Sequence, residues 1–196
     1  SMEKIQAIHT PREGNPDVVC DLLRLLSVNP DATNKDLEIG VTAFDHVIHL
    51  ARLFGFVDEH RRITKAGRGM LHLQKSGQYT RMALSLDQFE VVKSWKRHYD
   101  LDNFCELDFD TCLHFLQNSI KGVKKTTLRG RSSVLRRLCR SLMPYHPSRK
   151  LSGIEEIDTT RNTSLADEPV FGRRVIDVVN RIKAGSNDVR ISTGWM

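Results

Sequence analysis

The stretch LFGFVDEHRRITKAGRGML, residues 53–71, decides the fold that the sequence predicts. Gly55 is well placed to end a helix, because glycine adopts the left-handed conformation common after a last helical turn. Residues 56–63 predict two short strands around a polar turn. Thr64 can then cap a closing helix that runs to about Leu73. The pattern is therefore helix, short hairpin, helix.

Three helices are expected before this hairpin. Asn15 and Pro16 supply an N-cap and a first helical residue, and an apolar stripe continues to about Val28. Thr33 and Asp36 form an approximate capping box for a short second helix, which Gly40 ends.

The third of these helices spans about residues 42–54, and a helical wheel divides it into two faces. The apolar face holds Ala43, Phe44, Val47, Ile48, Ala51 and Phe54. The opposite face holds Thr42, Asp45, His49 and Arg52, with His46 at the flank.

This order of elements over about residues 15–75 resembles the winged helix-turn-helix domain of prokaryotic regulators and of restriction and defence proteins. The segments LFGFV, residues 53–57, and ITKAGRGML, residues 63–71, carry the resemblance. It implies a domain that binds duplex DNA through its third helix and its hairpin, the wing.

A second helical unit is expected over about residues 85–145. Ser85 can cap its first helix, and its second helix begins near Asp108. Its third helix spans about residues 126–143 and is strongly basic, so the unit resembles a second helix-turn-helix without a clear wing. Arg131 falls on the apolar side of this helix, which would fit a later helix start.

The predicted fold class is mainly α, with tandem helix-turn-helix units of which the first is winged by a short two-stranded β-hairpin. The expected domains are a winged unit at 15–80 and a second unit at 85–145. The other expected segments are a flexible arm at 1–14, a linker at 146–166, and a C-terminal piece at 167–196 with a helix and a strand.

Composition favours a folded cytoplasmic protein. The 196 residues are 39% hydrophobic and 28% charged, and no apolar run is long enough for a membrane helix. The four cysteines form no CxxC pair and lie in or beside apolar helical patterns, which predicts buried thiols in a reducing compartment. Cys105, Cys112, His114 and His98 match no closed zinc spacing, so we expect no metal and no cofactor.

Positive charge is concentrated in one region. The net charge is +6, and no Asp or Glu occurs between Thr111 and Ile154. Such a region favours a polyanionic partner. On the basic helix we expect contacts to DNA from Arg129, Ser133, Arg136, Arg137 and Arg140. Before that helix we expect phosphate contacts from Lys121, Lys124, Lys125, Thr126 and Thr127. A solvated basic face, or a surface for an acidic protein, is the alternative.

The first unit supplies the remaining candidate contacts. Thr42, Asp45, His46, His49 and Arg52 meet the requirement for short or planar polar groups on an outward helix face. His60, Arg61 and Arg62 lie where a wing tip reaches phosphate or the minor groove. An ordinary polar surface and a solvated turn explain these residues too.

No catalytic constellation stands out. Asp58, Glu59 and His60 resemble part of a nuclease site only by residue type, and they fall on the predicted hairpin, where exposure is expected. The sequence therefore predicts a non-enzymatic double-stranded DNA-binding protein, associated with the nucleoid when bound, that acts in regulation or as the recognition component of a restriction or defence system. A homodimer or a larger complex fits this role.

Two other functions stay open. One is a protein-interaction or assembly subunit that uses its winged-helix units to bind proteins. The other is the recognition fragment of a larger nuclease, which predicts a native chain that continues past Met196.

Overall fold

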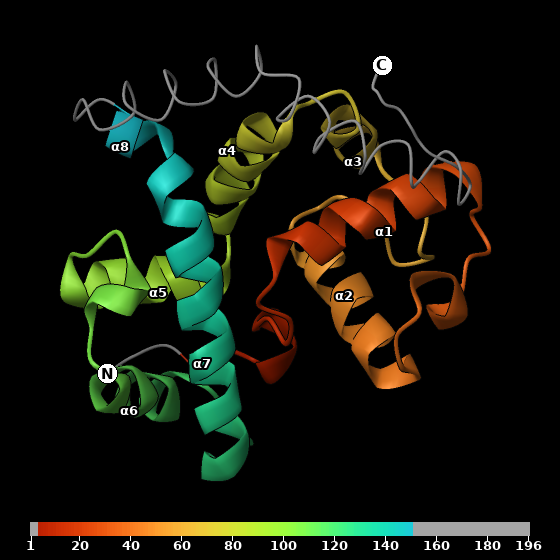
Figure 1. Cartoon of the computed structure of the whole chain (residues 1–196). Helices are drawn as coiled ribbons and strands as arrows, with labels where there is room; N and C mark the ends of the chain where they lie inside the picture. Colours follow the sequence, from red (N-terminus) through yellow and green to blue (C-terminus); the bar gives the residue numbers. More distant parts are fainter. Residues whose placement is uncertain (1–3, 151–196) are drawn as a thin grey trace. The chain divides into compact units, whose positions relative to one another are not determined.

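The computed structural model describes residues 4–150, with Lys150 described by its backbone alone. This part of the chain is mainly helical (Figure 1). The helices are α1 (Pro16–Val28), α2 (Val41–Leu53), α3 (Lys65–Met70), α4 (Lys75–Leu86), α5 (Glu90–Tyr99), α6 (Phe109–Ser119), α7 (Lys125–Leu142) and α8 (Pro147–Lys150). Short 3-10 helices are η1 (Ala7–His9), η2 (Asn34–Leu37), η3 (Phe104–Glu106) and η4 (Met143–Tyr145). The C-terminal helix and strand predicted within 167–196, and most of the predicted linker, lie outside the described residues.

Several predicted helix starts are confirmed by their caps. The Asn15 side chain accepts from the Asp17 N–H at 3.0 Å at the start of α1. Thr33 and Asp36 form the capping box of η2, and the Thr64 hydroxyl accepts from the Gly67 N–H at 3.1 Å at the start of α3. These caps satisfy backbone N–H groups that a helix end leaves without partners. Local sequence alone therefore fixed these boundaries.

The predicted β-hairpin is not formed in the described part of the chain. Val57 and Ile63 make a single isolated antiparallel bridge, and no strand extends from it within residues 4–150. The Asp58 N–H donates to the Arg62 carbonyl at 2.8 Å, so the segment is a tight turn. The second bond of this bridge runs from the Thr64 N–H to the Phe56 carbonyl at 2.9 Å, and the pairing ends there because α3 begins at Lys65.

Helix α4 replaces the predicted start at Ser85. Ser85 lies inside α4, where its hydroxyl donates to the Phe54 carbonyl at 3.2 Å, and the next helix begins at Glu90. The inward residues of α4 are Gln78, Tyr79, Met82, Ala83 and Leu86. Their spacing is helical, and the sequence pattern missed it because two of these residues carry polar groups.

One hydrophobic cluster runs through residues 5–143. Helix α7 is central to it, since it packs against α6, α4, α1, η3 and η4 (Figure 1). Among the described residues, 4–147 form one compact unit. The division into separate domains at 15–80 and 85–145 stays a prediction.

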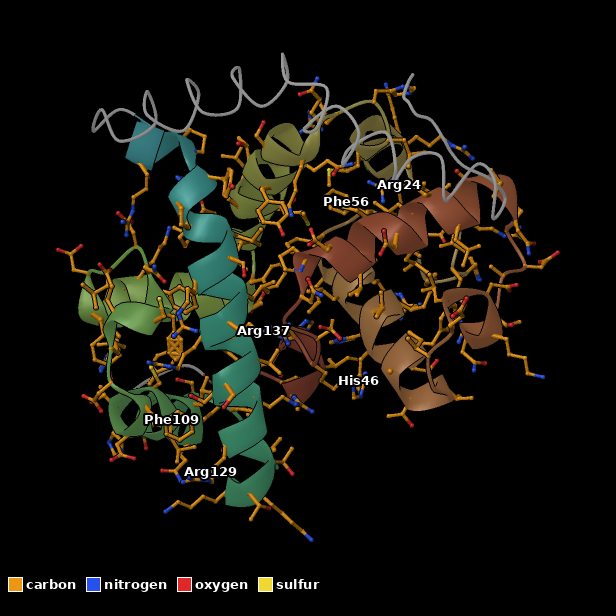
Figure 2. All side chains as sticks on the ribbon, viewed as in Figure 1. Arg24, His46, Phe56, Phe109, Arg129 and Arg137 are labelled. Atoms are coloured by element: carbon orange, nitrogen blue, oxygen red, sulfur yellow. The ribbon has the colours of Figure 1, made fainter. Side chains whose placement is uncertain are left out.

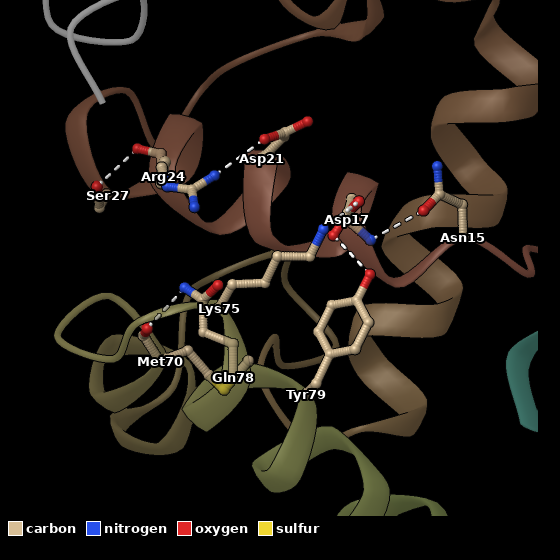
Figure 3. A network of polar contacts seen from close by, with 9 residues as sticks. All are labelled: Asn15, Asp17, Asp21, Arg24, Ser27, Met70, Lys75, Gln78 and Tyr79. Carbon is tan, nitrogen blue, oxygen red and sulfur yellow. Dashed lines mark hydrogen bonds and ion pairs between the residues drawn. The ribbon is translucent and has the colours of Figure 1, made fainter. Parts of the chain in front are cut away.

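A polar group joins α1 to α4 at the edge of this core (Figure 3). The Tyr79 hydroxyl donates to Asp17 Oδ1 at 2.7 Å, and Lys75 Nζ lies 3.4 Å from Asp17 Oδ2. Burial is the main cause that raises the pKa of Tyr79, and the hydrogen bond to Asp17 raises it further. The tyrosine is therefore a neutral hydrogen-bond donor at neutral pH.

Residues 4–14 differ from the flexible arm that the sequence predicts. The Ile5 N–H donates to the Ser119 carbonyl at 2.6 Å, and the Lys121 N–H donates to the Ile5 carbonyl at 3.1 Å. Ile5, Thr10, Pro11 and Gly14 are buried. The segment, called the N-terminal arm below, lies between α7 and α2 (Figure 1). Backbone pairing holds it, which side-chain patterns do not reveal.

Candidate nucleic-acid interface

The exposed face of α7 carries most of the predicted basic contacts. Arg129, Ser133, Arg137 and Arg140 are exposed on it. Lys121, Lys124, Lys125, Thr126 and Thr127 are exposed at its N-terminal end. Within residues 4–150, no carboxylate forms an ion pair with any of these cations. The structure thus gathers most of the predicted basic residues on one surface.

The aromatic ring of Phe109 orients one of these cations. The guanidinium carbon of Arg129 lies 5.2 Å from the Phe109 ring centroid (Figure 2). A cation over a ring face is held by the ring quadrupole while it keeps its charge. Arg129 therefore remains available to an anion on its outer side.

Arg136 does not belong to the exposed face, which corrects the sequence-based expectation. Its Nη1 donates to the Leu107 carbonyl and lies 3.1 Å from Cys112 Sγ. The arginine holds the segment between η3 and α6 against α7. It lies at the edge of the polar face, close enough to the core for its long side chain to reach inward.

Helix α2 presents a smaller polar face than the wheel indicates. Thr42, Asp45 and Arg52 are exposed and His46 is half-buried. Burial, together with the nearby Arg12 and Arg131, lowers the pKa of His46, so its imidazole is neutral at neutral pH. Ala43, expected on the apolar face, is exposed because the first turn of α2 extends past the core.

His49 is buried, which is the clearest correction on α2. Only 5% of its surface is exposed, because the N-terminal arm covers this side of the helix. Its Nε2–H donates to the Ile8 carbonyl at 2.7 Å, an assignment that follows because a carbonyl can only accept. Burial lowers the pKa of His49. It fastens the arm and is not a base-reading residue on this surface.

The turn after α2 is tied back to that helix. Arg61, whose φ of 62° is unusual for an arginine, pairs with Asp45 at 3.1 Å and lies 5.7 Å from the Phe44 ring centroid. Arg52 Nε donates to the Asp58 carbonyl at 3.3 Å. His60 and Arg62 are exposed at the turn. The turn that carries the predicted wing residues is therefore held against α2 by the contacts of Arg61 and Arg52.

Two arginines that sequence reasoning did not place in the site, one on the arm and one on α7, line the same recess. Arg131 Nη1 donates to the Ala7 carbonyl at 3.2 Å and to Thr10 Oγ1 at 2.5 Å. Arg12 and Arg131 line a recess of about 270 Å³ with Ala7 and Ile8. The signal in the sequence was the position of Arg131 on the apolar side of its helix. Helix α7 does not start later than predicted. Instead, the Arg131 side chain extends away from the helix core face and contacts the arm.

No metal or membrane feature appears in the described part of the chain. In residues 4–150, no three or more His, Cys, Asp or Glu side chains are grouped to hold a metal ion. None of the helices there combines the length and apolar character needed to cross a membrane.

Comparison of the sequence with models of protein families, with curated proteins and with solved structures finds no match.

Proposed function

We propose that this protein binds duplex DNA, with the exposed face of α7 as its main phosphate-binding surface. The observation that carries the proposal is the set of cations on and before α7, which have no carboxylate ion-pair partner within residues 4–150. Like charges brought together on one helix face repel one another, and a polyanion relieves that repulsion.

Helix α2 and its turn supply the second part of the proposal, in which the unit acts as a helix-turn-helix and the tight turn at 58–62 takes the place of the predicted wing. Thr42, His46 and Arg52 would contact base edges or groove atoms, and His60 and Arg62 would contact phosphate. The Arg61–Asp45 pair at 3.1 Å supports this arrangement because it neutralises the one carboxylate of α2 and fixes the turn. A role in regulation, restriction or defence is part of the same proposal.

The test is fluorescence anisotropy of a labelled random-sequence duplex, titrated with the full chain across a salt series. If Lys121, Lys124, Lys125, Arg129, Arg137 and Arg140 each displace a counterion, the log–log slope of affinity against salt is about −5. Replacing Arg137 and Arg140 by Glu should weaken binding at least about tenfold and flatten the slope. A slope near zero would overturn the proposal.

The matched control is the double variant Lys93→Glu with Arg97→Glu on α5. Both residues are exposed, and the net-charge change is the same as in the α7 variant. Equal loss of affinity in both variants would show that only overall charge matters and would remove α7 from the interface. No duplex binding at low salt, together with binding of an acidic protein, would favour the assembly function instead.

A further inference from the structure

The recess beside the N-terminal arm is lined by two arginines. Its lining is Ala7, Ile8, Arg12 and Arg131, so all of its charge is positive. Glu13 and Asp45 also act on His46 nearby, but Arg12 and Arg131 affect its pKa more strongly. Glu13 accepts from the Asn15 N–H at 2.7 Å, and Asp45 pairs with Arg61. The local field in the recess therefore favours an anion.

Arg131 is fixed in place and has donors to spare. Both of its hydrogen bonds, to the Ala7 carbonyl and to Thr10 Oγ1, come from Nη1. Within the described residues, Nε and Nη2 have no hydrogen-bond acceptor. These two groups form the edge of a guanidinium that binds two oxygens of one phosphate or carboxylate. The side chain is thus held in position before a ligand arrives.

Arg12 is the second cation that lines the recess. It is half-buried, and no carboxylate within residues 4–150 forms an ion pair with it. Its charge lowers the pKa of Arg131, with which it lines the recess, and of both His46 and His49. Two cations that face one recess repel each other until an anion enters.

We infer that this recess binds a single phosphate group between Arg12 and Arg131. A phosphate offers more acceptor oxygens than one guanidinium edge can use, whereas one arginine satisfies a carboxylate. The inference deepens the proposed function and rests on it for the source of the phosphate, a DNA strand. The arm lies between α7 and α2, the helices that carry Arg137 and His46 (Figure 2), and it supplies three of the four residues that line the recess. A strand phosphate held there would connect the two proposed contact surfaces.

The first experiment uses inorganic phosphate alone, without DNA. Histidine resonances of the full chain are followed by NMR during a phosphate titration at constant ionic strength, with sodium chloride as the balancing salt. We expect saturable shifts and a higher pKa of His46, because the bound anion offsets Arg12 and Arg131. Arg12→Gln should weaken phosphate binding about tenfold or more. The phosphate affinity of Arg12→Lys should lie between those of Arg12→Gln and the unaltered protein, because lysine keeps the charge and loses the planar fork.

The matched control is Arg97→Gln, which removes one exposed positive charge from α5. It should leave phosphate affinity unchanged, and thermal unfolding of each variant shows whether the fold is intact. Non-saturable shifts, or equal phosphate affinity in Arg12→Gln and in the unaltered protein, would overturn the inference.

The second experiment separates this inference from the proposed function and identifies the source. Phosphate binding that depends on Arg12, without duplex binding, would retain the recess as a site for free phosphate and remove the DNA function. Duplex binding with no effect of Arg12→Gln on duplex or phosphate would retain the DNA function and remove the recess. If both hold, tighter binding of a duplex with 5′-phosphates than with 5′-hydroxyls assigns a strand end, and equal affinities assign a backbone phosphate.

Discussion

The hydroxyl of Tyr79 on α4 donates to Asp17 in the first turn of α1 at 2.7 Å, and the two residues are 62 positions apart. Lys75 adds an ion pair to the same carboxylate and lies 5.3 Å from the Tyr79 ring centroid (Figure 3). The bond therefore links the start of the chain's first long helix to a helix that the sequence pattern did not predict.

Tyr79→Phe should lower the free energy of unfolding by about 1 kcal/mol, since it removes one hydrogen bond and keeps the buried ring. Urea unfolding followed by circular dichroism measures this change. Tyr145→Phe is the control, because that ring packs against Tyr79 at 5.1 Å without sharing the Asp17 bond. Tyr145→Phe also keeps its ring and should leave stability nearly unchanged, so an equal loss in both variants would argue that the bond to Asp17 is not the source of the loss.

Gly67→Ala should destabilise the protein by about 2 kcal/mol or more, because a Cβ at this position would lie 2.2 Å from the Phe56 carbonyl oxygen. Gly130→Ala is the matched control in exposed α7, where no atom lies within 4 Å of the added methyl group. It should stabilise the protein by about 0.5–1 kcal/mol. Thermal unfolding distinguishes the two signs, and a stable Gly67→Ala variant would contradict the close approach of α3 to the turn.

Arg136→Ala should cost about 1–3 kcal/mol, because it leaves the Leu107 carbonyl and the Cys112 thiol without their charged partner. Arg140→Ala, on the exposed face of the same helix, should change stability by less than about 0.5 kcal/mol. Denaturant melts of the two single variants compare them directly. Similar values would place Arg136 on the exposed face, as the helical wheel predicts.

Stability should fall as the pH drops below about 6.5, the ordinary value for histidine. The folded-state pKa of His49 is lowered, so between that lower pKa and 6.5 the unfolded chain binds more protons than the folded chain. The stabilising contribution is fully present above 6.5 and is lost as the pH falls toward the folded pKa. His46 acts in the same direction.

Urea melts from pH 7.5 to pH 5 measure this effect, with His49→Gln as the comparison. The variant should be less stable at pH 7.5, since its side chain replaces the bond to Ile8 poorly, and its stability should depend less on pH. His60→Gln at the exposed turn is the control and should follow the unaltered protein. An unchanged pH dependence in His49→Gln would exclude His49 as the group responsible.

The sequence by itself determined where several helices begin and which of their residues are apolar. Asn15, Thr33, Thr64 and Asp108 each cap the helix that was predicted after it, because capping involves only neighbours along the chain. The basic face of α7 was predictable for the same reason, since side chains three and four residues apart share one face of a helix.

Only the tertiary structure decided which polar residues turn inward. The helical wheel placed His49 and Arg136 on polar faces and Arg131 on an apolar side. Each of the three donates to a carbonyl of a distant segment, that of Ile8, Leu107 and Ala7 respectively. A helical wheel assumes one buried direction, whereas α2 and α7 are each covered from more than one side. Carbonyls that packing partly removes from water need donors, and that requirement arises only when the N-terminal arm and the segment before α6 pack against these helices.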